Sequence, residues 1–196
     1  MIKRIFDIVT SLIALVILLP VFITISIWIL LDSRGGIIYR QLRAGKNNRD
    51  FFIFKFRTMR PASDAAGLLT IGGRDPRITH AGYYLRKSKL DELPQLFNII
   101  MGKMSIVGPR PEVRKYVKLY TEEQMKVFGV RPGLTDYASL EYIDESNILA
   151  ASDDPEKTYI ETIMPAKLDL NLKYIRERSM GRDIKIIFTT IIRIFK

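Results

Sequence analysis

The chain has 196 residues, no cysteine, one histidine and a formal net charge of +10 from 31 basic and 21 acidic residues. The lack of cysteine excludes disulfides and thiolate metal sites, and a single histidine, His80, argues against a histidine-rich metal site or a Ser-His-Asp hydrolase. The positive charge favours anionic partners: phospholipid headgroups, phosphorylated substrates or nucleic acid.

The first predicted element is a run of 24 uncharged residues, Ile8–Leu31. About 20 such residues suffice for a helix to span the hydrocarbon core of a bilayer, and the run lacks the polar face of a soluble amphipathic helix. Pro20, near its middle, predicts a kink or a break. The residues alone favour a kinked crossing helix, whereas basic residues on both flanks suit a helix-break-helix that enters and leaves by one face. We therefore predict a membrane segment over residues 1–33 and a cytoplasmic domain over residues 34–196.

The next stretch, Asp32–Arg60, carries eight basic and two acidic residues, which suits contact with anionic headgroups. Within it, the alternation of Asp50–Met59 predicts a strand with three phenylalanines on one face. Lys55 and Arg57 share the other face and point toward water or toward an anion. From the strand alone, an ordinary solvated face is the simpler interpretation.

Further along, composition predicts a loop over residues 61–75, a helical stretch over residues 112–128 and a turn at Arg131–Gly133. The acid-rich segment Glu141–Glu161 should lie away from an anionic membrane. The chain ends in an amphipathic helix over about residues 182–196. Its apolar stripe, against a basic face, suits either an interfacial helix or a helix packed on the core, and comprises Ile184, Ile187, Phe188, Ile191, Ile192 and Phe195.

The segment Lys89–Pro111 carries the candidate chemistry. Pro94 is tolerated only in the first turn of a helix, so we predict a helix that begins between Asp91 and Leu93, with Gly102 at its C-terminal end. The helix end and nearby cations should keep Asp91 ionised. Acids at such a position are usually caps, but two adjacent carboxylates also permit one to attack phosphorus while the other helps to hold Mg²⁺.

Arg110 lies between two prolines in Gly108–Pro111. A guanidinium held in a stiff loop suits bidentate phosphate recognition, and the alternative is a plain turn with a surface arginine.

Four motifs occur in order along the chain: KFRTM (Lys55–Met59), LDELPQLFN (Leu90–Asn98), MSIVGPRP (Met104–Pro111) and RPGLT (Arg131–Thr135). Together with the N-terminal apolar segment, they closely resemble the bacterial sugar transferases, also called small monotopic phosphoglycosyl transferases. The resemblance covers nearly the whole chain, and four motifs in sequence are far more specific than one.

The resemblance implies an enzyme of the phosphotransferase class that moves a sugar-1-phosphate from a UDP-sugar to a polyprenyl phosphate, usually undecaprenyl phosphate, and releases UMP. It implies Mg²⁺ as cofactor, the cytoplasmic face of the bacterial inner membrane as location, an anionic phospholipid surface as partner, and no nucleic acid. The fold expected is α+β and mostly helical, with a short β element, interfacial amphipathic helices and a re-entrant first helix broken at Pro20. This expectation replaces the crossing helix.

The resemblance also assigns roles by position. Asp91 attacks the sugar-linked phosphorus and forms a covalent phosphosugar intermediate, and Glu92 acts on the side of Mg²⁺ and the diphosphate, so both acids are predicted as catalytic and metal-binding. The remaining predicted residues contact substrate: Lys55, Arg57, Arg86, Arg110, Arg131 and Asp169.

The chain departs from the family pattern at three places. Leu19 stands where the family often has serine, Lys103 where it commonly has aspartate, and Asp136–Ser139 where it has Gly-Trp-Ala-Gln. These differences leave the sugar open. The alternatives to a transferase are a membrane-associated scaffold or anionic-ligand binding module, and a phosphatase that uses an aspartyl-phosphate.

Overall fold

The computed structural model describes residues 2–61, 63, 69, 72 and 75–194. In chain order its helices and strands are α1 (Ile2–Asp32), β1 (Ile38–Ala44), β2 (Asp50–Phe56), α2 (His80–Lys87), α3 (Gln95–Ile100), β3 (Ser105–Val107), α4 (Arg114–Val117), β4 (Gly133–Thr135), α5 (Tyr137–Glu141), α6 (Glu145–Ala150), α7 (Pro155–Thr158), α8 (Met164–Glu177) and α9 (Met180–Ile194). The 3-10 turns Lys46–Asn48, Leu90–Glu92 and Gln124–Gly129 and the π turn Tyr159–Ile163 lie between them. The expectation of a mostly helical chain with a short β element is confirmed.

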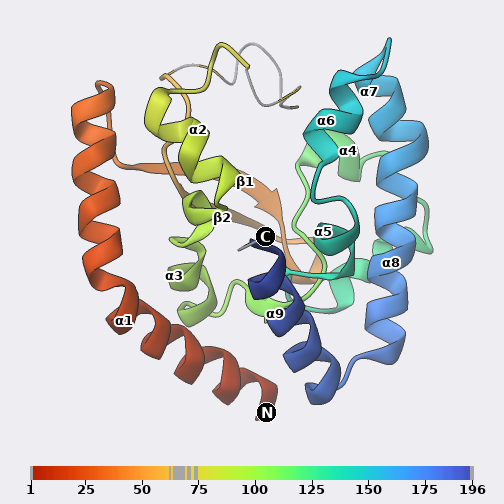
Figure 1. Cartoon of the computed structure of the whole chain (residues 1–196). Helices are drawn as coiled ribbons and strands as arrows, with labels where there is room; N and C mark the ends of the chain where they lie inside the picture. Colours follow the sequence, from red (N-terminus) through yellow and green to blue (C-terminus); the bar gives the residue numbers. More distant parts are fainter. Residues whose placement is uncertain (1, 62, 64–68, 70–71, 73–74, 195–196) are drawn as a thin grey trace.

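Helix α1 forms one side of the molecule and α8 the opposite side (Figure 1). Helices α2 and α3 pack against α1, and α9 packs on the β3–β4 pair and α5. The antiparallel hairpin β1–β2 passes behind α2, and β3 pairs with β4 in parallel. The chemistry-bearing segment therefore lies in the middle of the molecule, between the α1 side and the α8 side.

Helix α1 runs without interruption through Pro20 and bends about midway along its length (Figure 1). Among the described residues it is the one helix long and apolar enough to cross a membrane by length and composition, and only 11% of its most apolar 18-residue window is buried. The bend agrees with the lost backbone hydrogen bond and steric clash that proline causes. The expected break at Pro20 is wrong, because the helix continues through it, whereas its re-entrant or crossing placement stays a prediction.

Both ends of α1 are bound to the rest of the domain. Near its start, Lys3 pairs with Asp183 of α9, and Arg4 donates to the carbonyls of Ile99 and Ile100 at the end of α3, at 2.6 and 3.0 Å. At its other end, the carboxylate of Asp32 accepts a hydrogen bond from the backbone N–H of Ala81, at 3.1 Å, at the start of α2. The apolar helix is therefore fastened at both ends to the same body.

A buried carboxylate adds a third attachment. Asp7, 2% exposed, accepts a hydrogen bond from the Ser105 hydroxyl at 2.8 Å and another from the Ile106 N–H at 3.2 Å. Strand β3, which contains both donors, leads directly into the loop that carries Arg110. Asp7 thus links the first helix to the strand that precedes Arg110, a contact that the sequence did not reveal.

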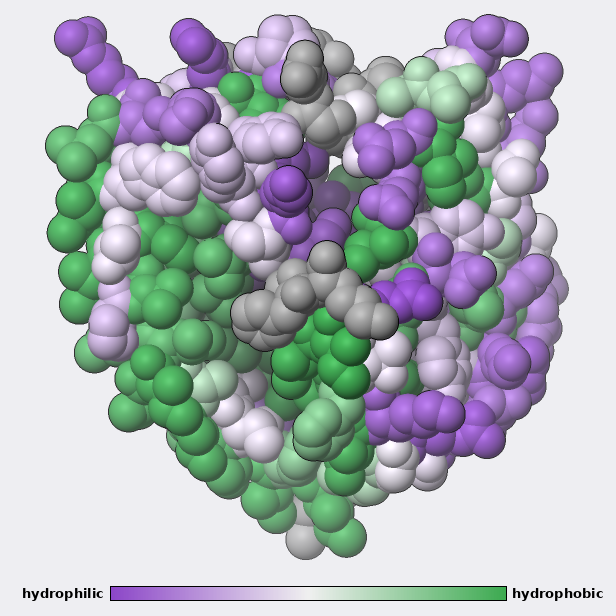
Figure 2. Space-filling model, in the orientation of Figure 1, coloured by the Kyte–Doolittle hydropathy of each residue, from purple (hydrophilic) through white to green (hydrophobic). Residues whose placement is uncertain are grey.

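Helix α9 starts two residues earlier than predicted and packs on the domain through Asp183 and Ile186, which are 2% and 1% exposed. The interpretation of the apolar stripe as a core-packing face is wrong for its exposed members, which are Ile184, Phe188, Ile191 and Ile192. The space-filling view shows a continuous apolar surface over α1 and toward α9, whereas the α8 side is polar (Figure 2). Membrane contact by α9 stays a prediction, and Phe195 lies outside the described residues.

Two sequence expectations are wrong. Residues 112–128 are not one helix but the single turn α4 and the 3-10 turn Gln124–Gly129, because their apolar side chains pack into one core cluster from separate segments and tertiary packing overrides local propensity. The expected turn at Arg131–Gly133 is instead extended backbone leading into β4. Gly133 permits this, because a Cβ there would lie 2.1 Å from the backbone nitrogen of Gly108.

The predicted strand Asp50–Met59 is confirmed over β2, which ends at Phe56, and Met59 makes only an isolated bridge to Ile78. Gly102, with φ of 79°, lies just beyond α3 as predicted. Most of the loop predicted over residues 61–75 lies outside the described residues.

Candidate active site

The acid pair lies in the short 3-10 turn Leu90–Glu92 rather than in the first turn of a longer helix. Lys89 has φ of 57°, in the left-handed region, which redirects the chain between α2 and this turn. Pro94 then precedes α3, where its missing N–H removes no helical hydrogen bond. The predicted single helix is thus two short elements, and Asp91 is buried at their junction.

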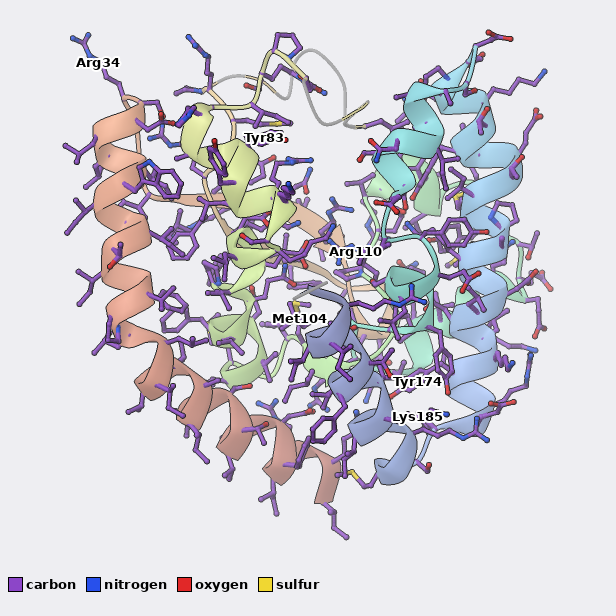
Figure 3. The ribbon with its side chains drawn as sticks, in the orientation of Figure 1. Arg34, Tyr83, Met104, Arg110, Tyr174 and Lys185 are labelled. Carbon is purple, nitrogen blue, oxygen red and sulfur yellow. The ribbon has the colours of Figure 1, made fainter. Side chains whose placement is uncertain are left out.

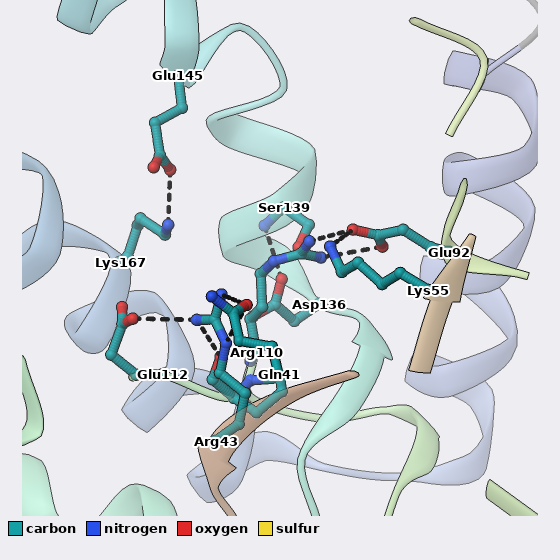
Figure 4. A network of polar contacts seen from close by, with 11 residues as sticks. Gln41, Arg43, Lys55, Glu92, Arg110, Glu112, Asp136, Ser139, Glu145 and Lys167 are labelled. Atoms are coloured by element: carbon teal, nitrogen blue, oxygen red, sulfur yellow. Dashed lines mark hydrogen bonds and ion pairs between the residues drawn. The ribbon is translucent and has the colours of Figure 1, made fainter. Parts of the chain in front are cut away.

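Glu92 is the centre of a three-residue ion cluster (Figure 4). Lys55 from β2 donates through Nζ to its Oε1 at 2.8 Å. Arg110 donates through both terminal nitrogens, Nη1 to Oε2 at 3.2 Å and Nη2 to Oε1. The ordinary solvated face considered for Lys55 is therefore wrong, and Arg110 makes the bidentate contact with a carboxylate that it would make with a phosphate.

The cluster determines which groups are charged. Burial opposes ionisation of Glu92, but its ion pairs with Arg110 and Lys55 outweigh this and hold the pKa of Glu92 well below its usual value. The charge of Glu92 in turn raises the pKa of Arg110. For Lys55, burial lowers the pKa, and Glu92 offsets only part of that effect. The site thus contains one firmly ionised carboxylate between two cations.

Asp91 behaves differently from its neighbour. Burial raises the pKa of its carboxyl, Lys55 opposes the rise, and the negative charge of Glu92 adds to it. In the described part of the chain, no hydrogen bond reaches this carboxylate. Burial therefore outweighs the nearby cations in its effect on the pKa of Asp91, and the expectation that this carboxyl stays ionised remains a prediction. Asp91 thus presents a buried carboxyl that accepts no hydrogen bond in the described structure, and burial makes its ionisation less favourable than that of a free aspartate.

Arg110 is held at its backbone by a residue that the sequence did not mark as functional. Its N–H donates to Oδ2 of Asp136 at 3.0 Å. Asp136 is fully buried and its Oδ1 also accepts from the N–H of Ser139 at 2.6 Å, which caps α5. Figure 3 shows Arg110 in the middle of the molecule, between the α2–α3 side and the α8 side. An aspartate before a helix signals a cap, but not a contact with residue 110.

The structure brings together Asp91, Glu92, Lys55 and Arg110, and places Arg86 near enough to Asp91 that its charge lowers the pKa of that carboxyl. Three other predicted substrate contacts lie elsewhere. Arg57, buried, donates to the carbonyl of Ser33 at 2.8 Å and to that of Arg34 at the end of α1. Arg131 donates to Gly102 O at 2.9 Å, beyond α3, and Asp169 is exposed on α8.

The donor set can be tested against Mg²⁺. Within the described residues no group of three or more histidines, cysteines or acids is placed to hold a metal. However, Mg²⁺ in phosphate chemistry is commonly held by one or two carboxylates together with the substrate's phosphates. Asp91 has free oxygens, whereas both oxygens of Glu92 accept hydrogen bonds from Lys55 and Arg110. The pair fits a metal that arrives with a diphosphate, with Asp91 the less encumbered ligand.

The geometry can therefore position an anionic phosphorus centre against cations, beside a buried carboxylate with free lone pairs. Lys55 and Arg110, from distant segments, both contact Glu92, and the carboxyl of Asp91 precedes it in the chain. Attack on phosphorus with transfer of the phosphoryl-linked group to the protein is the chemistry that such an arrangement permits.

Comparison with known proteins agrees with this chemistry. The family described as "Bacterial sugar transferase" matches residues 1–196. The chain is 39% identical over 198 residues to an undecaprenyl-phosphate glucose phosphotransferase of Komagataeibacter xylinus, covering 97% of this chain and 35% of the relative. It is 36% identical over 197 residues to the exopolysaccharide production protein PSS of Rhizobium leguminosarum bv. phaseoli, covering 97% of this chain and 93% of the relative.

It is also 35% identical over 198 residues to a UDP-glucose:undecaprenyl-phosphate glucose-1-phosphate transferase of Escherichia coli (strain K12), covering 100% of this chain and 40% of the relative. The chain thus spans well under half the length of the first and third of these relatives, and nearly all of the second.

Proposed function

Because this chain belongs to the bacterial sugar transferase family, we propose that it transfers a sugar-1-phosphate from a UDP-sugar to undecaprenyl phosphate or a similar polyprenyl phosphate and releases UMP. The observation that carries the proposal is the buried Asp91 carboxyl, free of hydrogen bonds in the described structure, beside the Lys55–Glu92–Arg110 cluster. The names of the relatives support undecaprenyl phosphate as acceptor. Such a transfer is the first membrane step in the assembly of a bacterial glycoconjugate.

The reaction divides into two displacements at the same phosphorus. In the first, an ionised oxygen of Asp91 attacks the sugar-linked phosphorus, the bond from this phosphorus to the bridging oxygen breaks, and UMP leaves with that oxygen. In the second, a phosphate oxygen of the polyprenyl phosphate attacks, the bond to Asp91 breaks, and the carboxylate is restored. The products are UMP and a polyprenyl diphosphate sugar, so atoms and charge balance without an oxidant or reductant.

Lys55 and Arg110 act by stabilising negative charge on the substrate. The diphosphate brings negative charge toward Lys55 and Arg110, whose positive charges stabilise the oxygens of the leaving UMP. Glu92 holds these two side chains in one arrangement before the substrate arrives, so less reorganisation is needed during the reaction. Arg86, close to Asp91, favours the ionised form that attack requires.

We propose Mg²⁺ as the cofactor, held by Asp91 and Glu92 together with the diphosphate. When bound, it neutralises phosphate charge and polarises the phosphorus–oxygen bonds.

We place the enzyme at the cytoplasmic face of the bacterial inner membrane, with α1 as a re-entrant helix. This is supported by the binding of both ends of α1 to the same domain, through Arg4 and Asp7 at one end and Asp32 at the other. A crossing helix would place its two ends, and the parts of the domain bound to them, on opposite faces of the bilayer. The exposed apolar faces of α1 and α9 supply the membrane contact, and basic residues near them suit anionic phospholipids.

The deciding experiment incubates the full chain with a panel of UDP-sugars, Mg²⁺ and polyprenyl phosphate, and follows the nucleotide released. UMP supports the proposal, and intact-mass detection of a phosphosugar adduct that is absent in Asp91→Asn supports the intermediate. Release of UDP would rule out sugar-1-phosphate transfer, and phosphate release from the lipid without any nucleotide would favour a phosphatase. For topology, labelling of Ile2→Cys only from the periplasmic side would rule out the re-entrant arrangement.

A further inference from the structure

The residue that holds Arg110 lies where the chain departs from its family's pattern, in Asp136–Ser139. Asp136 has no solvent exposure, and each of its oxygens accepts one backbone hydrogen bond. One comes from Ser139, inside α5, and the other from Arg110, in the loop after β3. A single carboxylate therefore joins the start of α5 to the arginine of the ion cluster.

The two prolines beside Arg110 make its hydrogen bond to Asp136 important for the backbone of this loop. Pro109 and Pro111 have no N–H, so within residues 109–111 the N–H of Arg110 is the only backbone donor. Both prolines are buried, and the N–H would lack its acceptor if Asp136 were shortened. Fixing this N–H, between two residues of restricted φ, fixes the direction in which the guanidinium leaves the chain.

The negative charges of Glu92 and Asp136 also stabilise the charged form of Arg110. Glu92 raises the pKa of Arg110 most, and Asp136 adds to the rise, so the arginine has a carboxylate at each end. Figure 4 shows Arg110 between Asp136 and Glu92, with Ser139 beside it. The hydroxyl of Ser139, on α5, is buried without a hydrogen-bond partner among the described residues.

We propose that Asp136 is a positioning residue: it acts through Arg110 by holding the backbone and thereby the guanidinium that contacts the diphosphate. It touches neither substrate nor the reacting atoms. The role of Arg110 rests on the proposed function, whereas the hydrogen bond from Arg110 to Asp136 does not.

The test uses Asp136→Ser in the full chain. Serine is itself a good helix cap, so α5 keeps its cap, but its single oxygen cannot occupy the positions of both Oδ1 and Oδ2, which accept from Ser139 and Arg110. The matched control is Asp154→Ser, because Asp154 caps the exposed helix α7 by accepting from Lys157 N at 3.0 Å, away from the cluster.

Two measurements separate the proposal from the enzyme function. Amide hydrogen exchange at residues 108–114 does not depend on activity: it should rise in Asp136→Ser and stay at the wild-type level in Asp154→Ser. Unchanged exchange at Arg110 would overturn the proposal. If no UDP-sugar yields UMP with the wild type, the proposed function fails while the exchange result still decides the positioning link.

The activity measurement is a double-mutant cycle with Arg110→Ala. Asp136→Ser should lower kcat/KM by about 10²-fold in the wild-type background, since small misplacements of a catalytic group have effects of that size. In the Arg110→Ala background its effect should be within about twofold. An equal loss in both backgrounds would show that Asp136 acts on the fold in general and not through Arg110.

Discussion

Replacing Asp7 by alanine tests whether the apolar helix is part of the folded domain. The substitution removes the acceptor of two hydrogen bonds, from the Ser105 hydroxyl at 2.8 Å and from the Ile106 N–H at 3.2 Å. Asp7 and Ser105 are 2% and 1% exposed, so water does not readily replace the lost acceptor. A buried donor left without a partner costs about 1–3 kcal/mol.

The Ser105 hydroxyl can rotate toward another acceptor, so its loss costs about 1 kcal/mol, at the low end of that range. Together with the loss at the Ile106 N–H, Asp7→Ala should lower the free energy of unfolding by about 2–4 kcal/mol. For a chain of this size about 1 kcal/mol corresponds to roughly 2–4 °C, which predicts a melting temperature lowered by roughly 4–16 °C. Asp7→Asn retains one carbonyl acceptor and should show about half of this loss.

The assay is thermal unfolding of the full chain in detergent micelles, with UMP release measured in parallel. Ile17→Ala is the control, because Ile17 lies on the same helix, is 69% exposed and should change the melting temperature little. A melting temperature for Asp7→Ala equal to that of the wild type would show that the first helix is not docked on β3, and would remove the main support for both ends lying on one membrane face.

Five further predictions concern the site and the residues around it. Asp91→Asn should reduce UMP release by at least about 10³-fold while the melting temperature is unchanged or higher, because burial already favours the neutral group; retained turnover would exclude Asp91 as nucleophile. Because burial raises the pKa of Asp91, kcat/KM should rise with pH along an acid limb whose midpoint lies above 3.8, and a midpoint at or below 3.8 would contradict this. The pKa of Glu92 is lower in the folded state than in the unfolded state, so ionised Glu92 stabilises the fold above pH 4.5. This stabilisation is lost as the pH falls through the folded pKa, and Glu92→Gln should lose this pH dependence of the free energy of unfolding in denaturation measured across pH. Arg57→Lys should destabilise the chain by about 1–3 kcal/mol in thermal unfolding, because an ammonium cannot reproduce the fork that binds Ser33 and its neighbour, whereas exposed Arg60→Lys should be neutral. Removal of divalent metal with a chelator should abolish UMP release and added Mg²⁺ should restore it; activity that persists in the chelator would contradict the metal assignment.

Local signals in the sequence were sufficient for several elements. The uncharged run predicts α1, because length and hydrophobicity are properties of consecutive residues. Gly102 predicts the end of α3, because a positive φ is a local requirement. The stripe on α9 is exposed, and its 3.6-residue period can be read directly from the chain.

Other features depend on partners far away in sequence. The turn expected at Arg131–Gly133 became part of β4 because its backbone pairs with β3, and composition does not report such pairing. Arg57 shares a strand face with Lys55, yet it lies at the end of α1, where it binds carbonyls 23 and 24 residues earlier in the chain. The position of a residue along a strand predicts the face on which its side chain lies, but not which groups pack against that face.

The acid pair shows the same division most clearly. The sequence by itself determined that Asp91 and Glu92 are adjacent, that Pro94 follows them, and that an arginine between two prolines comes after them. Only the tertiary structure decided the directions in which their pKa values shift: Glu92 meets Lys55 and Arg110, 37 and 18 residues away, whereas Asp91 is buried without a hydrogen-bonding partner in the described structure. The physical reason is that a carboxyl's ionisation depends on burial and on the charges around it in space, and neither is a property of neighbouring residues in the chain.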